Sequence, residues 1–168
     1  MREIPLTKGK SAWVDDADHQ RVSALKWHAT RDHRHPERYY AYRKIGHRGP
    51  SQSMHCFIMQ PPKGMEVDHE DGDGLNNQRN NLRVCTKSQN MANMVSRTNR
   101  HGFKGVARHK FGWMAQIQQN KKRHCSYHDT PEEAARAYDS MARRLFGTFA
   151  KTNFKETEVP CGTSSQEA

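Results

Sequence analysis

The sequence is poor in apolar residues and contains no long hydrophobic run. Hydrophobic residues make up 33% of the 168 residues, below the roughly 45–50% typical of globular proteins, and the mean hydropathy is -1.10. One large buried core is therefore not expected, and small modules with thin cores are favoured. No apolar run approaches the roughly 20 residues of a membrane helix, and the N-terminus lacks a signal-peptide stretch. We expect a soluble protein that stays in the cytoplasm and has no membrane partner.

Cysteine is also scarce, and no CxxC pair is present. The four cysteines are Cys56, Cys85, Cys125 and Cys161. Their scattered spacing argues against a disulfide framework or a zinc ribbon, so we expect buried, reduced thiols.

Positive charge is abundant and unevenly distributed. The chain has 28 Lys and Arg against 18 Asp and Glu, a net charge of +10, and the isoelectric point is about 9.7. Residues 98–154 hold 11 basic and 4 acidic side chains, a net of +7. An anionic partner is expected, nucleic acid first and a membrane surface or acidic protein second. The segment 155–168 holds one Lys and three Glu and is expected to be a disordered tail.

The first fifty residues indicate short strands and one small helix. Residues 12–14 form a strand-like run, and the segment Asp15-Asp16-Ala17-Asp18 offers caps for a helix that ends at Leu25. Trp27 and the run Tyr39–Tyr42 suit two strands around a loop at 31–38. The aromatic residues here are expected in the core rather than as platforms for bases.

The most informative stretch runs from Met65 to Asn90. Met65–Val67 and Leu82–Cys85 are strand candidates separated by a loop of Gly, Asp and Asn, and Thr86 can cap a following helix. Asp68 and His69 lie at the end of the first strand, on opposite faces.

These residue types suit hydrolysis assisted by a metal ion. The Asp68 carboxylate and the Asn90 amide oxygen can bind a hard divalent cation, while neutral His69 can accept a proton from water. Asn81 can orient the imidazole ring. Taken alone, an Asp-His pair before Asp71-Gly72-Asp73 is usually a solvated turn, and we assign both of those acids to turn geometry. A calcium loop is disfavoured because Leu75 stands where an acid is required.

The same residues resemble the HNH nuclease family, in the homing-endonuclease branch with the ββα-metal fold. The match comprises residues 67–73 and 75–77, then 81–83 with Thr86, then Gln89-Asn90, within a motif core of 54–95. The resemblance implies that Asp68 and Asn90 bind Mg²⁺ or Mn²⁺, that His69 is the general base and that Asn81 positions it. His55 resembles a segment that precedes the motif, and structural packing and a phosphate contact remain equally open for it.

Residues 102–154 predict a three-stranded antiparallel sheet packed on one helix. The strands are expected at 105–110, 113–118 and 123–127, and the helix begins at Thr130-Pro131 and ends at Gly147. Alternation predicts that Trp113, Ala115, Ile117, Cys125 and Tyr127 face the helix. The outward residues are then Met114, Gln116, Gln118, Lys122 and His124. Such a face suits the DNA major groove, although a solvated surface is the other reading.

This second module resembles the plant ethylene-response-factor (AP-two type) DNA-binding domain. The match includes Phe103–Val106, the run Trp113-x-Ala115-x-Ile117 and the helix Glu132-Glu133-Ala134-Ala135-x-Ala137-Tyr138-Asp139. The resemblance implies docking in the DNA groove. Several positions where the plant domain has Arg or Trp differ here, so the plant target sequence does not carry over. The expected DNA contacts are Arg108, His109, Met114, Gln116, Gln118, Lys122 and His124.

Together these readings predict an α+β protein of two modules. Residues 1–97 form a nuclease domain, 98–101 a linker, 102–154 a DNA-binding domain and 155–168 a tail. The expected function is metal-dependent hydrolysis of double-stranded DNA by a monomeric nicking or homing enzyme of a bacterial or phage-infected cell. The alternatives are a non-catalytic DNA-binding regulator and, less favoured, a structural RNA-binding protein.

Overall fold

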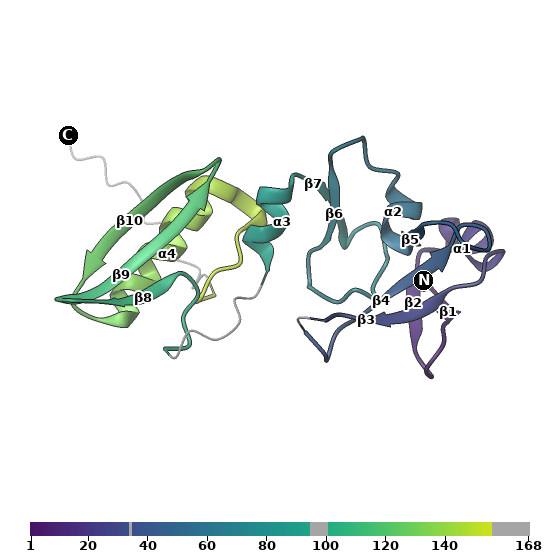
Figure 1. The fold of residues 1–168 in the computed structure, drawn as a ribbon, viewed down its shortest axis with the longest axis horizontal. Coiled ribbons are helices and arrows are strands. Elements are labelled where there is room, and N and C mark those ends of the chain that lie inside the picture. The colour runs from purple at the N-terminus through teal and green to yellow at the C-terminus, as the bar shows by residue number, and fades with distance from the viewer. Residues whose placement is uncertain (34, 95–100, 156–168) are drawn as a thin grey trace, which may run out of the picture. The chain divides into compact units, whose positions relative to one another are not determined.

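The computed structural model describes residues 1–33, 35–94 and 101–155. The chain divides into two compact units, Met1–Met94 and Val95–Ala168, each with its own small sheets and helices (Figure 1). This is the mixed α and β architecture, with several small antiparallel sheets and few helices, that the sequence predicts. No helix among the described residues is long and apolar enough to cross a membrane. The predicted linker and tail, and Cys161, fall largely outside the described residues.

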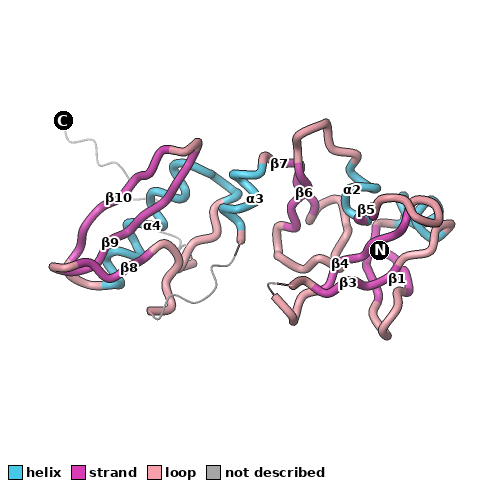
Figure 2. Tube along the Cα trace, viewed as in Figure 1, coloured by secondary structure: helices cyan, strands magenta, loops and turns pink. Residues whose placement is uncertain are grey.

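The N-terminal unit contains three small antiparallel sheets, β1-β2, β3-β4-β5 and β6-β7. Short strands and helices alternate with longer loops along this unit (Figure 2). Its elements are β1 (Arg2–Pro5), β2 (Ser11–Val14), α1 (Asp16–Ser23), β3 (His28–Arg31), β4 (Tyr39–Lys44), β5 (Ser51–Ser53), α2 (Met54–Met59), β6 (Glu66–His69), β7 (Leu82–Cys85) and α3 (Lys87–Asn93).

The core of this unit is small, as the low apolar content requires. Alternation on β2 buries Ala12 and Val14 and leaves Trp13 38% exposed. Trp27 is buried with its indole N–H donating to the Val22 carbonyl at 2.8 Å. The same cluster takes side chains from β1, β2, α1, β4, α2, β6 and β7: Ile4, Ala12, Val14, Val22, Trp27, Ala41, Met54, Ile58, Val67 and Leu82.

A buried carboxylate paired with two partly exposed arginines fixes the long loop between β6 and β7. Asp18 on α1 is 2% exposed and accepts hydrogen bonds from Arg21 at 2.6 Å and from Arg79, in the loop, at 2.7 Å. The loop also adds to the edge of β2, where the Trp13 N–H donates to the Leu75 carbonyl at 2.9 Å. Buried charges need such partners, so the loop is held to the core before any ligand binds.

The C-terminal unit is a three-stranded antiparallel sheet, in the order β10-β9-β8, that packs against one helix. Its elements are β8 (Val106–His109), β9 (Gly112–Gln119), β10 (Lys122–His128), α4 (Pro131–Phe146) and a 3-10 turn at Gly147–Phe149. The predicted capping box of α4 is confirmed, because Thr130 accepts from the Glu133 N–H and the Glu133 carboxylate accepts from the Thr130 N–H.

The predicted face of β10 is wrong by one residue. Asn120 and Lys121 form a two-residue turn with φ of 50° and 65°, which places Lys122 opposite Gln119 and Arg123 opposite Gln118. Paired residues share a face of an antiparallel sheet. The open face of β10 therefore carries Arg123, Cys125 and Tyr127, while Lys122, His124 and Ser126 lie on the helix side.

The expectation that the thiols are buried is wrong for Cys125, which is exposed on the open face, although Cys56, Cys85 and Cys125 are all free thiols. On α3, the short helix turns Ala92 toward the unit and leaves Met91 53% exposed.

Candidate functional site

Strand β6 divides its side chains between two environments. Asp68 and His69 are both buried, 6% and 5% exposed, and point to opposite faces of the β6-β7 hairpin because neighbouring residues in a strand alternate. Glu66 shares the face of Asp68. The site therefore has an imidazole on one side of the hairpin and two carboxylates on the other.

Asn77 is the asparagine that contacts His69. The two side chains join through His69 Nε2 and Asn77 Oδ1 at 3.4 Å, and Asn77 is fully buried. The Asn77 amide nitrogen donates to the Leu75 carbonyl at 3.1 Å, which fixes the amide oxygen toward the ring. An oxygen only accepts, so Nε2 carries the proton and Nδ1 keeps its lone pair. This orientation presents Nδ1 as the basic atom of His69.

Burial lowers the pKa of His69 below its usual 6.5, and the bond to Asn77 and the nearby Asp71 and Asp68 only partly oppose that effect. Moving a charged imidazolium from water into the protein interior costs much solvation free energy, whereas burying the neutral ring costs little. His69 is therefore neutral near pH 7, in the form that accepts a proton.

Two further rings pack around His69. His55 on α2 lies edge-on to it, with ring centroids 4.9 Å apart, and Tyr40 on β4 lies 5.8 Å away. The buried His55 Nδ1 has no hydrogen-bond partner among the described residues. Burial, and then the neighbouring His69, lower the pKa of His55 to about 3, so its ring is neutral. The structure thus places His55 against the predicted base, which the sequence did not indicate.

Asp68 is held by a cation and an amide. Arg83 Nη2 lies 2.6 Å from Asp68 Oδ2, directly across the hairpin from it. Asn93 on α3 donates to both carboxylate oxygens at 3.0 Å. The negative charge of this carboxylate is therefore balanced by Arg83, and both of its oxygens are held in place.

Asn90 lies one turn before Asn93 on the same helix and meets a different acid. Its amide nitrogen donates to Glu66 Oε2 at 2.7 Å. Residues three apart on a helix share a face, as do residues two apart on a strand, so two Asn side chains face two carboxylates. The Thr86 capping box fixes the start of this helix. No hydrogen bond joins Asp68 to Asn90 among the described residues. Glu66 and Asn93, which were not predicted as site residues, complete the cluster.

The chemistry of this cluster fits a hard divalent cation. Carboxylate and amide oxygens are the ligands that Mg²⁺ and Mn²⁺ favour. No group of three or more His, Cys, Asp or Glu suited to a metal is present within the described ranges, so amides would have to supply part of the coordination. Arg83 and the Asn93 amide nitrogen occupy the Asp68 carboxylate in this structure, so a cation bound there would compete with both.

Asn81, the predicted partner of His69, braces the loop instead. It donates to Asp71 Oδ1 at 3.0 Å and to the Asn76 carbonyl at 2.9 Å, and accepts from the Asp71 N–H at 3.1 Å. Both of its amide hydrogens are thus used within the loop. The loop also packs on Tyr40, since a Cβ at Gly74 would lie 2.3 Å from that ring. The expected turn roles of Asp71 and Asp73 are confirmed, because each accepts from an N–H two residues ahead.

The predicted DNA contacts of the C-terminal unit separate into two groups. His109, Met114, Gln116 and Gln118 lie on the open face of the sheet, as their pairing requires. Arg108, Lys122 and His124 pair with residues of the other face. The sheet also brings Arg123 and Tyr127, which are not among the predicted contacts, onto the open face.

Comparisons with known proteins identify part of the chain. Residues 60–92, which contain β6, β7 and most of α3, match the family model of HNH endonuclease. An uncharacterized HNH endonuclease of Acanthamoeba polyphaga mimivirus is 36% identical over 93 residues, 55% of this chain and 49% of the relative. No solved structure matches the chain.

Two other relatives differ in character. The ethylene-responsive transcription factor ERF084 of Arabidopsis thaliana is 54% identical over 58 residues, 32% of this chain and 22% of that protein. Protein 3.8 of Escherichia phage T7 is 33% identical over 94 residues, 54% of this chain and 77% of the phage protein. The chain thus spans about half the length of the mimivirus relative and much less of the plant factor. It contains an HNH endonuclease domain, and it belongs to one family with Protein 3.8 of phage T7.

Proposed function

We propose that this protein is a metal-dependent endonuclease that cuts one strand of double-stranded DNA, as a monomeric nicking or homing-type enzyme. The observation that carries the proposal is a buried, neutral His69 directly beside Asp68, whose carboxylate belongs to a cluster of two carboxylates and two amides. The match of residues 60–92 to the HNH endonuclease family supports the same chemistry. The net charge of +10 supports a polyanionic substrate.

His69 is the general base in this proposal. Its Nδ1 takes a proton from the water that attacks the phosphorus, while the bond from Nε2 to Asn77 holds the ring and stabilises the imidazolium that forms. Asn81 acts through the loop, because it anchors Asp71 and the turn that carries Asn77. Asn81 is thus a positioning residue.

Asp68 and Asn90 are proposed to hold Mg²⁺ or Mn²⁺, together with Asn93 and Glu66, which lie on the same two faces. A bound divalent cation would polarise the phosphodiester and stabilise charge on the leaving oxygen. Arg83 balances the charge of Asp68 when no cation is bound. When a cation occupies the site, the guanidinium of Arg83 can contact a phosphate oxygen instead.

The C-terminal unit is proposed to bind the duplex. It carries a net charge of +7 over residues 98–154, and His109, Gln116, Gln118 and Arg123 on its open face can contact base edges and phosphates. One nuclease site cuts one strand, so a double-strand break needs two copies of the chain.

The test uses supercoiled plasmid with Mg²⁺ or Mn²⁺. We expect conversion to the nicked circle, and we expect His69→Ala to slow it by about 10²–10⁴-fold, the usual contribution of a general base. His47→Ala is the matched control, because His47 is exposed and lies outside the β6-β7-α3 region. Equal rates for His69→Ala and the parent would exclude His69 as the base.

A non-catalytic DNA-binding regulator is the second candidate. The ion pair of Asp68 with Arg83 at 2.6 Å favours it, because a carboxylate whose charge is already balanced by an arginine needs no metal. This candidate predicts salt-sensitive binding to duplex DNA and no nicking with Mg²⁺, Mn²⁺, Ca²⁺ or Co²⁺. Nicking by the parent chain that His69→Ala abolishes would exclude it.

A further inference from the structure

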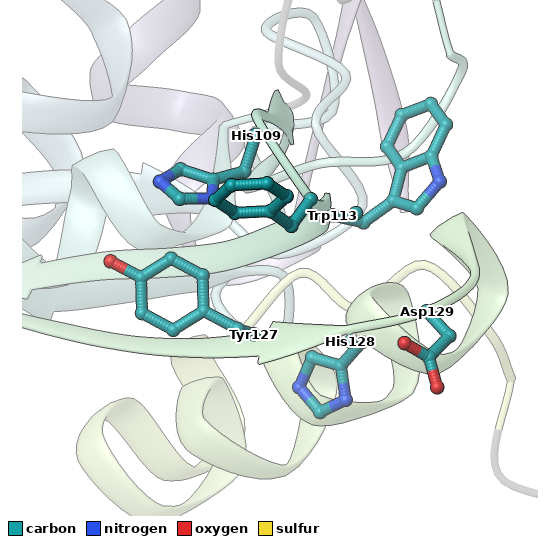
Figure 3. A pocket seen from close by; sticks show the side chains of 7 residues that line it. His109, Trp113, Tyr127, His128 and Asp129 are labelled. Atoms are coloured by element: carbon teal, nitrogen blue, oxygen red, sulfur yellow. The ribbon is translucent and has the colours of Figure 1, made fainter.

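The open end of the C-terminal sheet contains an aromatic pocket. A cavity of about 310 Å³ lies where the β8-β9 turn meets the end of β10. Figure 3 shows Tyr127 and His109 close together on one side of it and Trp113 on another. The pocket is lined chiefly by His109, Phe111, Trp113, Tyr127, His128 and Asp129. We call this set the aromatic pocket.

Two of these rings are exposed to solvent, and one of them, Tyr127, was expected to face the helix. Phe111 is 83% and Tyr127 is 60% exposed. Exposed large rings gathered at one cavity mark a binding surface. The exposure of Tyr127 follows from the pairing of the strands, which turns Tyr127 and His109 to the face away from α4.

The backbone is shaped to form this pocket. Gly112 has a φ of 150°, and a Cβ there would lie 2.5 Å from the carbonyl oxygen of His128. Only glycine allows the turn to approach the end of β10 this closely. The His109 and Tyr127 rings lie 4.7 Å apart at 58°, so the walls of the pocket present faces and edges of rings.

Two cations lie against rings that line the pocket. The Lys110 ammonium lies 5.0 Å from the centre of the Phe111 ring, and the Arg108 guanidinium lies 5.1 Å from that of Trp113. Arg123 is exposed on the same open face as Tyr127. Aromatic rings flanked by cations are the combination with which proteins bind single-stranded nucleic acid, the rings stacking on bases and the cations meeting phosphates.

We propose that the aromatic pocket binds an unstacked nucleobase of single-stranded DNA. Within a duplex, both faces of each base are covered by its neighbours, so a pocket walled by rings can accept only a base that has left the stack. The Asp129 carboxylate, which lines the pocket, can accept a hydrogen bond from an exocyclic amino group, which favours cytosine, adenine or guanine over thymine. The proposal rests on the proposed function only for the choice of nucleic acid as ligand.

The test measures binding by the full chain in EDTA, which prevents metal-dependent cleavage. Fluorescence anisotropy compares a labelled single-stranded oligonucleotide with a duplex of the same sequence. We expect Phe111→Ala and Tyr127→Ala each to weaken single-strand binding about five- to hundredfold and duplex binding less than about twofold. Phe111→Trp and Tyr127→Phe keep a stacking ring and are expected to restore it. Met91→Ala is the control, because Met91 is 53% exposed in the other unit.

A second readout is independent of affinity. A 2-aminopurine base in the single strand is quenched when it stacks on a ring, and we expect the parent chain, but not Phe111→Ala, to quench it at saturation. Equal weakening of single-strand and duplex binding, or no weakening of either, would overturn the proposal. Single-strand binding without nicking activity would refute the nuclease and leave the aromatic pocket supported.

Discussion

At the scale of single residues, the contacts of asparagine side chains decide the architecture of the site. Asn77, not Asn81, reaches His69, and Asn93, not Asn90, reaches Asp68. The sequence indicates which residue types gather at the site, because the motif residues flank two strands and a capped helix. Which amide meets which acid depends on a loop conformation and a helix rotation of about 100° per residue, for which the sequence offers no local signal.

The two loop asparagines are expected to differ in their effect on nicking. Asn77→Ala leaves the His69 ring unoriented, so we expect kcat to fall about tenfold or more with KM nearly unchanged; because the Asn77 side chain is fully buried and donates to the Leu75 carbonyl, we also expect a lower melting temperature. Asn81→Ala removes three loop hydrogen bonds, and we expect a clear loss of melting temperature as well. Plasmid nicking kinetics and thermal melts measure both. A larger fall in kcat for Asn81→Ala than for Asn77→Ala, at equal melting temperatures, would reverse the two roles.

His55 makes the stability of the metal-free protein depend on pH. Its pKa is about 3 in the folded chain and near 6.5 once unfolded, so between these values only the unfolded chain binds the proton. Stability is therefore complete above pH 6.5 and falls as pH falls toward 3, by about 1.4 kcal/mol per unit at most for this group. His69, whose pKa is also lowered, adds to the same trend.

Urea unfolding of the metal-free protein between pH 7 and pH 5 tests this effect. We expect the parent chain to lose about 2 kcal/mol more than His55→Phe over this range, because phenylalanine keeps a ring and takes up no proton. A His47→Phe variant, changed at an exposed histidine, is expected to follow the parent. Parallel pH profiles for the parent and His55→Phe would show that His55 titrates normally in the folded chain.

At the scale of elements, the sequence predicts existence better than orientation. The strands of the β6-β7 hairpin, the helix with its Thr86 cap, and the sheet and capped helix of the C-terminal unit all occur where turn residues and alternation indicate them. The face predicted for the side chains of β10 was wrong because it was assigned from the apolar residues of that strand. The two-residue turn before it, and not its own apolar pattern, sets its register.

That turn also provides a prediction about stability. Lys121 has a φ of 65°, a conformation that is unfavourable for a residue with a side chain and natural for glycine in a two-residue hairpin. We expect Lys121→Gly to stabilise the C-terminal unit by about 0.5–1 kcal/mol, seen as a higher melting temperature. Lys122→Gly removes the same charge from an extended position of β10 and is expected to lower it. Destabilisation by both variants would argue against strain at this turn.

At the scale of the whole molecule, the chain combines two compact units with unequal charge. Each unit holds a local pattern of strands and a capped helix, which is the signal that a sequence offers for a module. The sequence does not reveal the contacts that fix the nuclease loop, such as Arg79 to Asp18, which join residues 61 positions apart. Contacts of this kind form between exposed-looking polar residues that carry no periodic signal.

The division of charge predicts how DNA affinity depends on salt. A chain ending at Met94 lacks the segment with a net charge of +7, so we expect it to bind duplex DNA at least tenfold more weakly. Its dependence of affinity on salt is expected to be shallower, since fewer counterions are released. Anisotropy in EDTA at several KCl concentrations measures both slopes. Equal affinity and slope for the two chains would place duplex binding in the N-terminal unit.

The tight turn at Asn120-Lys121 has an evolutionary consequence. Because side chains of a strand alternate, one extra codon in this hairpin could shift β10 by one position and exchange Arg123, Cys125 and Tyr127 on the open face for the residues now beneath them. No surface residue would need to mutate. A family with this scaffold could therefore acquire a new recognition surface in a single insertion event, while the nuclease unit stays unaltered.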